Sequence, residues 1–146
     1  MIGQFYLKFF EQFLDTAGQK RYRIGITSFF KYIDCAIIMY DVTSLASFQQ
    51  IPEHIQEFMK INIACNCPIF VVGNKIKDPN REVGEHMVAE LCESFGDKCF
   101  YTFVDTKFDD EHVSGCIDLI LAVILYGRIP NHDRSVKSAR TETVLP

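Results

Sequence analysis

Residues 35–41 read Cys-Ala-Ile-Ile-Met-Tyr-Asp, and this short run decides the fold. Every position before the final aspartate is apolar, which is typical of a strand covered on both faces in a parallel sheet. Two similar runs follow, Ile69–Val72, which ends at Gly73, and Phe100–Val104, which ends before an aspartate. The sequence therefore predicts three buried parallel strands.

Segments with helical periodicity separate these strands. After the first strand, apolar side chains recur at helical spacing from Phe48 to Met59. Ser47 and Gln50 form a capping-box pattern, which predicts that this helix begins at Ser47. Pro52 lies beyond the first turn of that predicted helix, where a missing N–H is expected to bend it.

Two more helices are predicted further along the chain. Glu82–Phe95 is amphipathic and is followed by Gly96, and His112–Tyr126 is strongly apolar and ends before Gly127. Alternating strands and helices predict an α/β fold, a mostly parallel sheet with helices on both faces. An earlier apolar segment around Phe5–Phe13 fits a strand or a helix equally well, and its pattern leaves both open.

Length and charge limit the possible functions. The 146 residues carry a net charge of -4, and we expect one domain over residues 1–128 followed by a polar, disordered tail over 129–146. An acidic chain is a poor binder of nucleic-acid polymers. The longest apolar run, Cys116–Tyr126, is too short to cross a bilayer, and the absence of cysteine after Cys116 predicts no prenylation.

The six cysteines have no spacing typical of a metal or redox site. Cys65 and Cys67 are the only close pair, and the four histidines share no ligand spacing with the cysteines. We therefore expect free, buried thiols and a cytoplasmic protein, rather than a redox or metal protein.

Polar residues after the first apolar segment suit phosphate chemistry. Asp15 follows Leu14 and is a candidate magnesium ligand, directly or through water. Gly18 lets a backbone N–H approach a terminal phosphate, and Gln19 has the side chain to orient an attacking water.

The same residues carry a family resemblance. Asp-Thr-Ala-Gly-Gln at 15–19, followed by Arg-Tyr-Arg at 21–23, closely resembles the switch-two motif of Ras-superfamily small GTPases. Residues 36–43 resemble the fourth strand of the Rab branch, Val72–Lys75 its guanine-recognition loop, and Asp105–Lys107 its Ser-Ala-Lys loop. The resemblance runs from about Ile2 to Gly127.

This resemblance implies a P-loop NTPase fold, GTP or GDP with Mg²⁺ as ligands, and switching in vesicle traffic through effector or regulatory proteins that contact switch two. It implies that Asp15 binds magnesium through water and that Gln19 positions water. It also implies nucleotide contacts that come from the following residues: Asp15, Gly18, Asn74, Lys75, Thr106 and Lys107. The family's guanine-reading aspartate is replaced by Lys77, and Asp78 lies one residue later.

The phosphate-binding part of the family pattern is missing from these residues. None of the eight glycines is followed by lysine, so the chain has no G-x-x-x-x-G-K-[ST] loop, and its resemblance includes no first strand. The expected function is a GTPase-family switch that is impaired in phosphate binding and hydrolysis. The alternative is a non-enzymatic interaction module.

Overall fold

The computed structural model describes residues 33–61, 67–107 and 110–126. The elements in chain order are β1 (Ala36–Asp41), α1 (Leu45–Gln49), α2 (Ile51–Ile61), β2 (Ile69–Asn74), α3 (Glu85–Ser94), β3 (Cys99–Phe103) and α4 (Asp110–Tyr126). All strand pairs are parallel, in the order β1-β2-β3. The predicted parallel α/β sheet is confirmed, whereas the Phe5–Phe13 segment, residues 15–19 and the tail lie outside the described residues.

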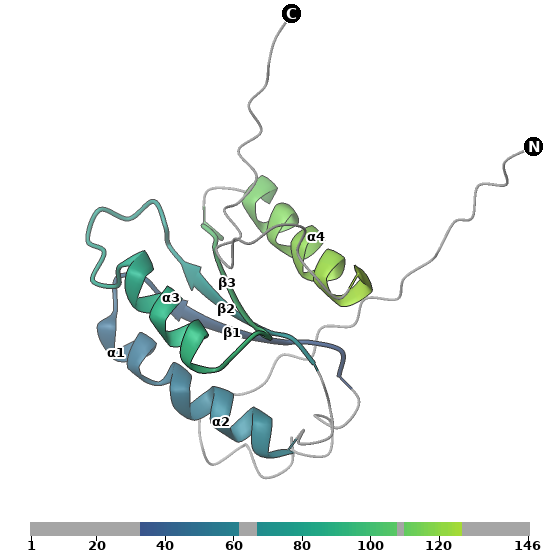
Figure 1. The fold of residues 1–146 in the computed structure, drawn as a ribbon. Helices are drawn as coiled ribbons and strands as arrows, with labels where there is room; N and C mark the ends of the chain where they lie inside the picture. Colours follow the sequence, from purple (N-terminus) through teal and green to yellow (C-terminus); the bar gives the residue numbers. More distant parts are fainter. Residues whose placement is uncertain (1–32, 62–66, 108–109, 127–146) are drawn as a thin grey trace, which may run out of the picture.

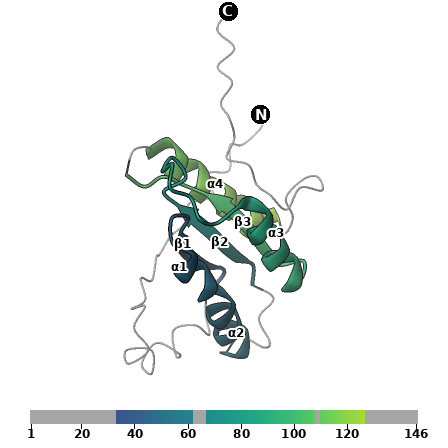
Figure 2. The same cartoon turned by 90° about the vertical axis from the view of Figure 1, so that its left-hand side faces the viewer.

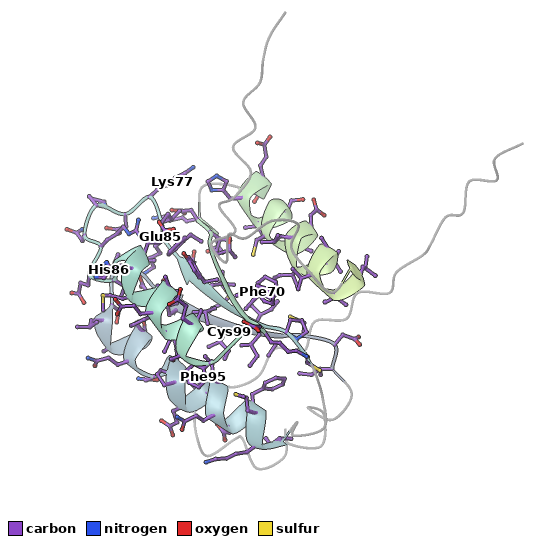
Figure 3. The ribbon with its side chains drawn as sticks, in the orientation of Figure 1. Phe70, Lys77, Glu85, His86, Phe95 and Cys99 are labelled. Atoms are coloured by element: carbon purple, nitrogen blue, oxygen red, sulfur yellow. The ribbon has the colours of Figure 1, made fainter. Side chains whose placement is uncertain are left out.

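Helices cover both faces of the sheet, as predicted. Helices α1, α2 and α3 lie on one side and α4 on the other (Figure 1). Figure 2 shows the same elements turned by 90°, with the side that carries α1–α3 facing the viewer. Alternate residues of β2 point to opposite faces, so Val71 packs with the α1–α3 layer while Phe70 and Val72 pack against α4. Phe70 lies between the sheet and α4 in Figure 3. This two-sided burial explains why β2 is apolar throughout.

Strand β1 is covered on one face more completely than on the other. Tyr40 is buried against the α1–α3 layer, but Ile37 and Met39 are 38% and 52% exposed. Ile37 and Met39 are in register with Phe70 and Val72 of β2, so they lie on the face that carries α4. Among the described residues, α4 therefore covers β2 more completely than β1.

The first helix begins earlier than its capping pattern predicts. Its N-cap is Ser44, whose extended backbone lets the side chain accept a hydrogen bond from the N–H of Ser47. Ser47 therefore lies inside α1, and a second helix, α2, begins at Ile51. Pro52 falls in the first turn of α2, where a missing N–H removes no helical hydrogen bond.

Helix α3 is shorter than predicted at its N-terminus. The N–H groups of Glu82 and Val83 both donate to the carbonyl of Val42, at 2.9 and 3.1 Å. These two residues are thus bound to the chain just beyond β1 and cannot join the helix, which begins at Glu85. At its other end, Gly96 has a φ of 92°, as a C-terminal glycine stop requires.

Among the cysteines that the structure describes, one differs from prediction. Cys35, Cys92, Cys99 and Cys116 are free, as expected, but Cys67 is disulfide-bonded. Burial raises the pKa of the Cys35 thiol to about 12 and that of Cys116 to about 11. Their surroundings therefore disfavour the reactive thiolate.

Gly73 is closely packed between side chains of the two neighbouring strands. It is in register with Tyr40 of β1 and Phe103 of β3, and both rings lean over it. A Cβ atom at this position would lie 2.7 Å from Phe103 Cδ1 and 2.7 Å from the Tyr40 hydroxyl. Glycine is therefore required by close packing from both neighbouring strands.

We predict that Gly73→Ala lowers the free energy of unfolding by about 1–3 kcal/mol, because the added methyl group overpacks the sheet. Urea denaturation followed by circular dichroism measures this change. Gly115→Ala is the matched control, since Gly115 lies in α4 with open space around it. It should stabilise the chain by about 0.5–1 kcal/mol. Equal stability of the two variants would contradict the assignment.

Candidate functional site

The carboxyl ends of the three parallel strands lie at the same edge of the sheet, where α/β folds bind their ligands. Asn74, the last residue of β2, connects this edge to the loop after β3. Its Nδ2 donates to Thr106 Oγ1 at 3.0 Å, and its Oδ1 accepts from the backbone N–H of Thr106 at 3.1 Å. One side-chain amide therefore holds two ligand-site loops together.

Lys75 connects the end of β2 to the end of β1, on the side opposite the Thr106 loop. Its φ of 64° places the backbone in the left-handed region, and its N–H donates to Asn74 Oδ1 at 2.8 Å. Its ammonium group forms an ion pair with Asp41 Oδ2 at the end of β1. The other oxygen of Asp41 accepts from the N–H and hydroxyl of Thr43, at 2.9 and 2.7 Å.

These contacts shift the protonation equilibria of the ion pair. The Lys75 hydrogen bond, with those from Thr43, lowers the pKa of the Asp41 carboxyl to about 2. The same Asp41 carboxylate raises the pKa of Lys75 above its ordinary value. Both groups are therefore charged at neutral pH.

Asp105 joins the loops after β2 and β3 through its carboxylate. Its Oδ2 accepts from the N–H of Lys77 at 3.1 Å, and its Oδ1 accepts from the N–H of Lys107 at 3.3 Å. Asp105 is only 2% exposed, so few water molecules can replace these bonds. The N–H of Ile76 also donates to the Val104 carbonyl, at 3.2 Å, which fixes the two loops at a second point.

The position of the family's base-reading aspartate has different chemistry here. Lys77 is exposed, and its side chain extends outward at this edge of the sheet (Figure 3). Asp78 Oδ1 accepts from both the backbone N–H and the side-chain amide of Asn80, at 2.9 and 3.1 Å. The loop thus directs the Asp78 carboxylate toward its own turn.

The structure brings together three of the residues singled out from the sequence: Asn74, Lys75 and Thr106. Lys107 joins them through its backbone N–H to Asp105. Asp15, Gly18 and Gln19 lie outside the described residues. Asp41 and Asp105 also contribute to this site, although they were not among the predicted site residues. Their positions at the ends of predicted strands were the signal that could have identified them, because ligands bind at strand ends in such folds.

The magnesium ligand predicted from the sequence, Asp15, lies outside the described residues. They contain no group of three or more histidine, cysteine or acidic side chains arranged to hold a metal. The strand-end carboxylates Asp41 and Asp105 already accept bonds from ammonium or N–H groups. None of the helices in this part of the chain combines the length and apolarity that a membrane crossing requires.

The depressed pKa of Asp41 predicts a pH dependence of stability. A carboxyl whose folded pKa lies below its unfolded value stabilises the fold above the unfolded pKa, and this contribution is lost as pH falls through the folded pKa. The stability difference between wild type and Asp41→Asn should therefore shrink between about pH 5 and about pH 2. Denaturation at each pH measures this difference, and Asp118→Asn, at an exposed position of α4, is the control. A constant difference would argue against the ion pair.

Removing the Asp105 carboxylate should destabilise the fold more than removing the Asp41 carboxylate. We predict that Asp105→Ala lowers the free energy of unfolding by about 2 kcal/mol or more, because the N–H groups of Lys77 and Lys107 lose a buried, charged acceptor. Hydrogen exchange at the Lys77 and Lys107 amides should accelerate. Asp78→Ala is the matched control, since it removes a carboxylate from an exposed turn and should cost about 1 kcal/mol or less. Equal losses would contradict the role of Asp105.

The sequence matches a known protein family over most of its length. Residues 8–122 match the model of the Ras family. The Ypt/Rab-type GTPase YPT7 of Saccharomyces cerevisiae is 34% identical over 111 residues, which are 68% of this chain and 53% of YPT7. The human Ras-related protein Rab-27B is 33% identical over 116 residues, 78% of this chain and 51% of its own length.

A longer match is to the human Ras-related protein Rab-9A, 28% identical over 137 residues, which are 91% of this chain and 65% of Rab-9A. The chain spans about half the length of the first two relatives. The family model covers well over half of this chain, and YPT7 is 34% identical over 68% of it. The chain therefore belongs to the Ras family, in its Rab-like branch.

Proposed function

We propose that this chain is a Rab-like domain of a cytoplasmic guanine-nucleotide switch in vesicle traffic, and that these residues bind the nucleotide through its base more than through its phosphates. The observation that carries the proposal is the Asn74 side chain, which holds the Thr106 loop beside the end of β2. This contact sets the spacing between the two loops that read the base in the family.

The base-binding side of the site has suitable chemistry. Asn74 and Asp105 hold the loops after β2 and β3 together through hydrogen bonds. The aliphatic part of Lys75 can pack along a base and ribose. The loop that faces guanine O6 in the family carries Thr106 and Lys107 here, and their N–H groups donate to Asn74 and Asp105, which fixes the shape of that loop.

The phosphate side depends on residues assigned by resemblance alone. We propose that Asp15 binds Mg²⁺ through water, Gly18 approaches the terminal phosphate and Gln19 positions water. These 146 residues contain no Walker A loop, the backbone cradle that supplies most of the phosphate contacts in such proteins. We therefore expect weak nucleotide binding and negligible hydrolysis by these residues alone.

Position 77 favours a second candidate function, a non-enzymatic module that binds effector or regulatory proteins through the switch-two region. A lysine presents only donors, and guanine N1 and N2 are donors as well. Asp78 does not replace the missing carboxylate in this structure, because its turn holds it against Asn80. A domain without guanine specificity would keep the fold and its protein-binding surfaces.

Titration of the purified chain with guanosine, GDP, GTP and ATP in the presence of Mg²⁺ separates these functions. We predict dissociation constants well above about 1 µM and similar values for guanosine, GDP and GTP, because the phosphates add little. Asn74→Ala should weaken guanosine binding about tenfold, as expected for the loss of the hydrogen bonds that shape the loop.

Lys77→Asp is the matched gain-of-function variant. It restores the carboxylate that accepts from guanine N1 and N2, so guanosine affinity should rise more than tenfold while ATP affinity does not. Affinity that rises steeply from guanosine to GTP would contradict the weak phosphate site. No guanosine binding by either wild type or Lys77→Asp would refute the nucleotide function and favour the interaction module.

A further inference from the structure

The Lys75 side chain crosses from one strand to its neighbour. Lys75 follows β2, but its ammonium group lies against the carboxylate that ends β1. Asn74, one residue earlier, reaches in the opposite direction, to the loop after β3. Two consecutive residues therefore connect the carboxyl ends of all three described strands.

Both partners of this ion pair are held in place by other bonds. Asp41 Oδ1 accepts from the N–H and the hydroxyl of Thr43, which orients Oδ2 toward Lys75. The N–H of Asp41 donates to Ser47 Oγ at 3.1 Å. On the other side, Asn74 Oδ1 accepts a hydrogen bond from the Lys75 N–H and fixes the backbone of Lys75. Fixed partners on both sides are what distinguishes this pair from a chance surface contact.

We propose that Asp41 is a positioning residue for nucleotide binding: it holds the Lys75 side chain across the ends of β1 and β2, so that the aliphatic part of that lysine is already in place for the base. This inference rests on the proposed function and deepens it. A free lysine side chain would lose more conformational freedom when a ligand orders it, so fixing it beforehand strengthens binding.

The pairing also restricts what Lys75 can recognise. Its ammonium charge is balanced by Asp41, so it attracts a phosphate group less than an unpaired lysine does. The part of Lys75 left for a ligand is the apolar chain of methylene groups. Asp41 therefore directs Lys75 toward the uncharged base and ribose.

The first test follows Lys75 itself. In chain labelled with ¹³C-lysine, NMR titration of the Lys75 Cε signal reports the protonation of its ammonium group. Asp41→Asn should lower the pKa of Lys75, and Asp41→Glu should restore part of the shift, because a carboxylate returns at a greater reach. Asp118→Asn, which removes a carboxylate from α4, is the control and should leave the Lys75 titration unchanged.

The second test measures guanosine binding by calorimetry. Asp41→Asn should weaken binding about two- to fivefold, the range of an exposed ion pair. The same change made in Lys75→Ala should have no further effect, because Asp41 acts through Lys75. Urea denaturation of each variant checks that the fold is retained, so that a loss of affinity is not a loss of structure.

The outcomes are separable. An unchanged Lys75 titration in Asp41→Asn overturns the inference, and so does an equal loss of guanosine affinity in the wild-type and Lys75→Ala backgrounds. If neither wild type nor Lys77→Asp binds guanosine, the proposed function fails and the positioning role falls with it, even where NMR confirms the ion pair. The inference is supported if Asp41→Asn shifts the Lys75 titration and weakens guanosine binding only in the chain that retains Lys75.

Discussion

Burial of β2 on both faces, with a strand paired on each edge, is the constraint on which the rest of this structure depends. Residues Ile69 to Gly73 are all buried, and their backbone groups bond to β1 on one side and β3 on the other. Neither face of this strand can carry a polar side chain without a buried partner. The first polar side chain therefore comes at Asn74, where the strand leaves the sheet, and this placement locates the site.

The site itself is a set of connections between strand ends that differ in strength. The Lys75–Asp41 pair is exposed to solvent, with side-chain exposures of 53% and 28%, so water and salt compete with it. Asp105 is almost completely buried and accepts hydrogen bonds from two backbone N–H groups, so water competes less with these bonds. The β2–β3 side of the site is therefore the rigid side, and the β1 side adjusts more easily.

Sequence patterns predicted the elements well wherever burial alone determines them. The three apolar runs became strands, and Gly96 ended its helix as expected. The error at α1 was local, because Ser44, three residues before Ser47, is the cap. The error at α3 occurred where a distant partner decides, since the N–H groups of Glu82 and Val83 donate to the Val42 carbonyl. No local periodicity contains such information.

The same distinction applies to the site. Asn74, Lys75 and Thr106 belong to short motifs and were predicted together, and the structure does join them. Asp41 and Asp105 act on partners 34 and 28 residues away, Lys75 and Lys77, that become neighbours only through the strand register. Their contribution could be suspected from their positions after strands, but their partners could not be identified.

The parallel register has a consequence for how this chain folds. Residues paired across β1 and β2, or across β2 and β3, lie about 30 positions apart in the sequence. None of the three described strands pairs through a tight hairpin, so each of these pairings must first close a long loop at an entropic cost. Such high contact order predicts slow formation of the sheet, with helices present before the strands have found their neighbours. The apolar run of β1 then stays exposed to solvent until β2 has paired with it.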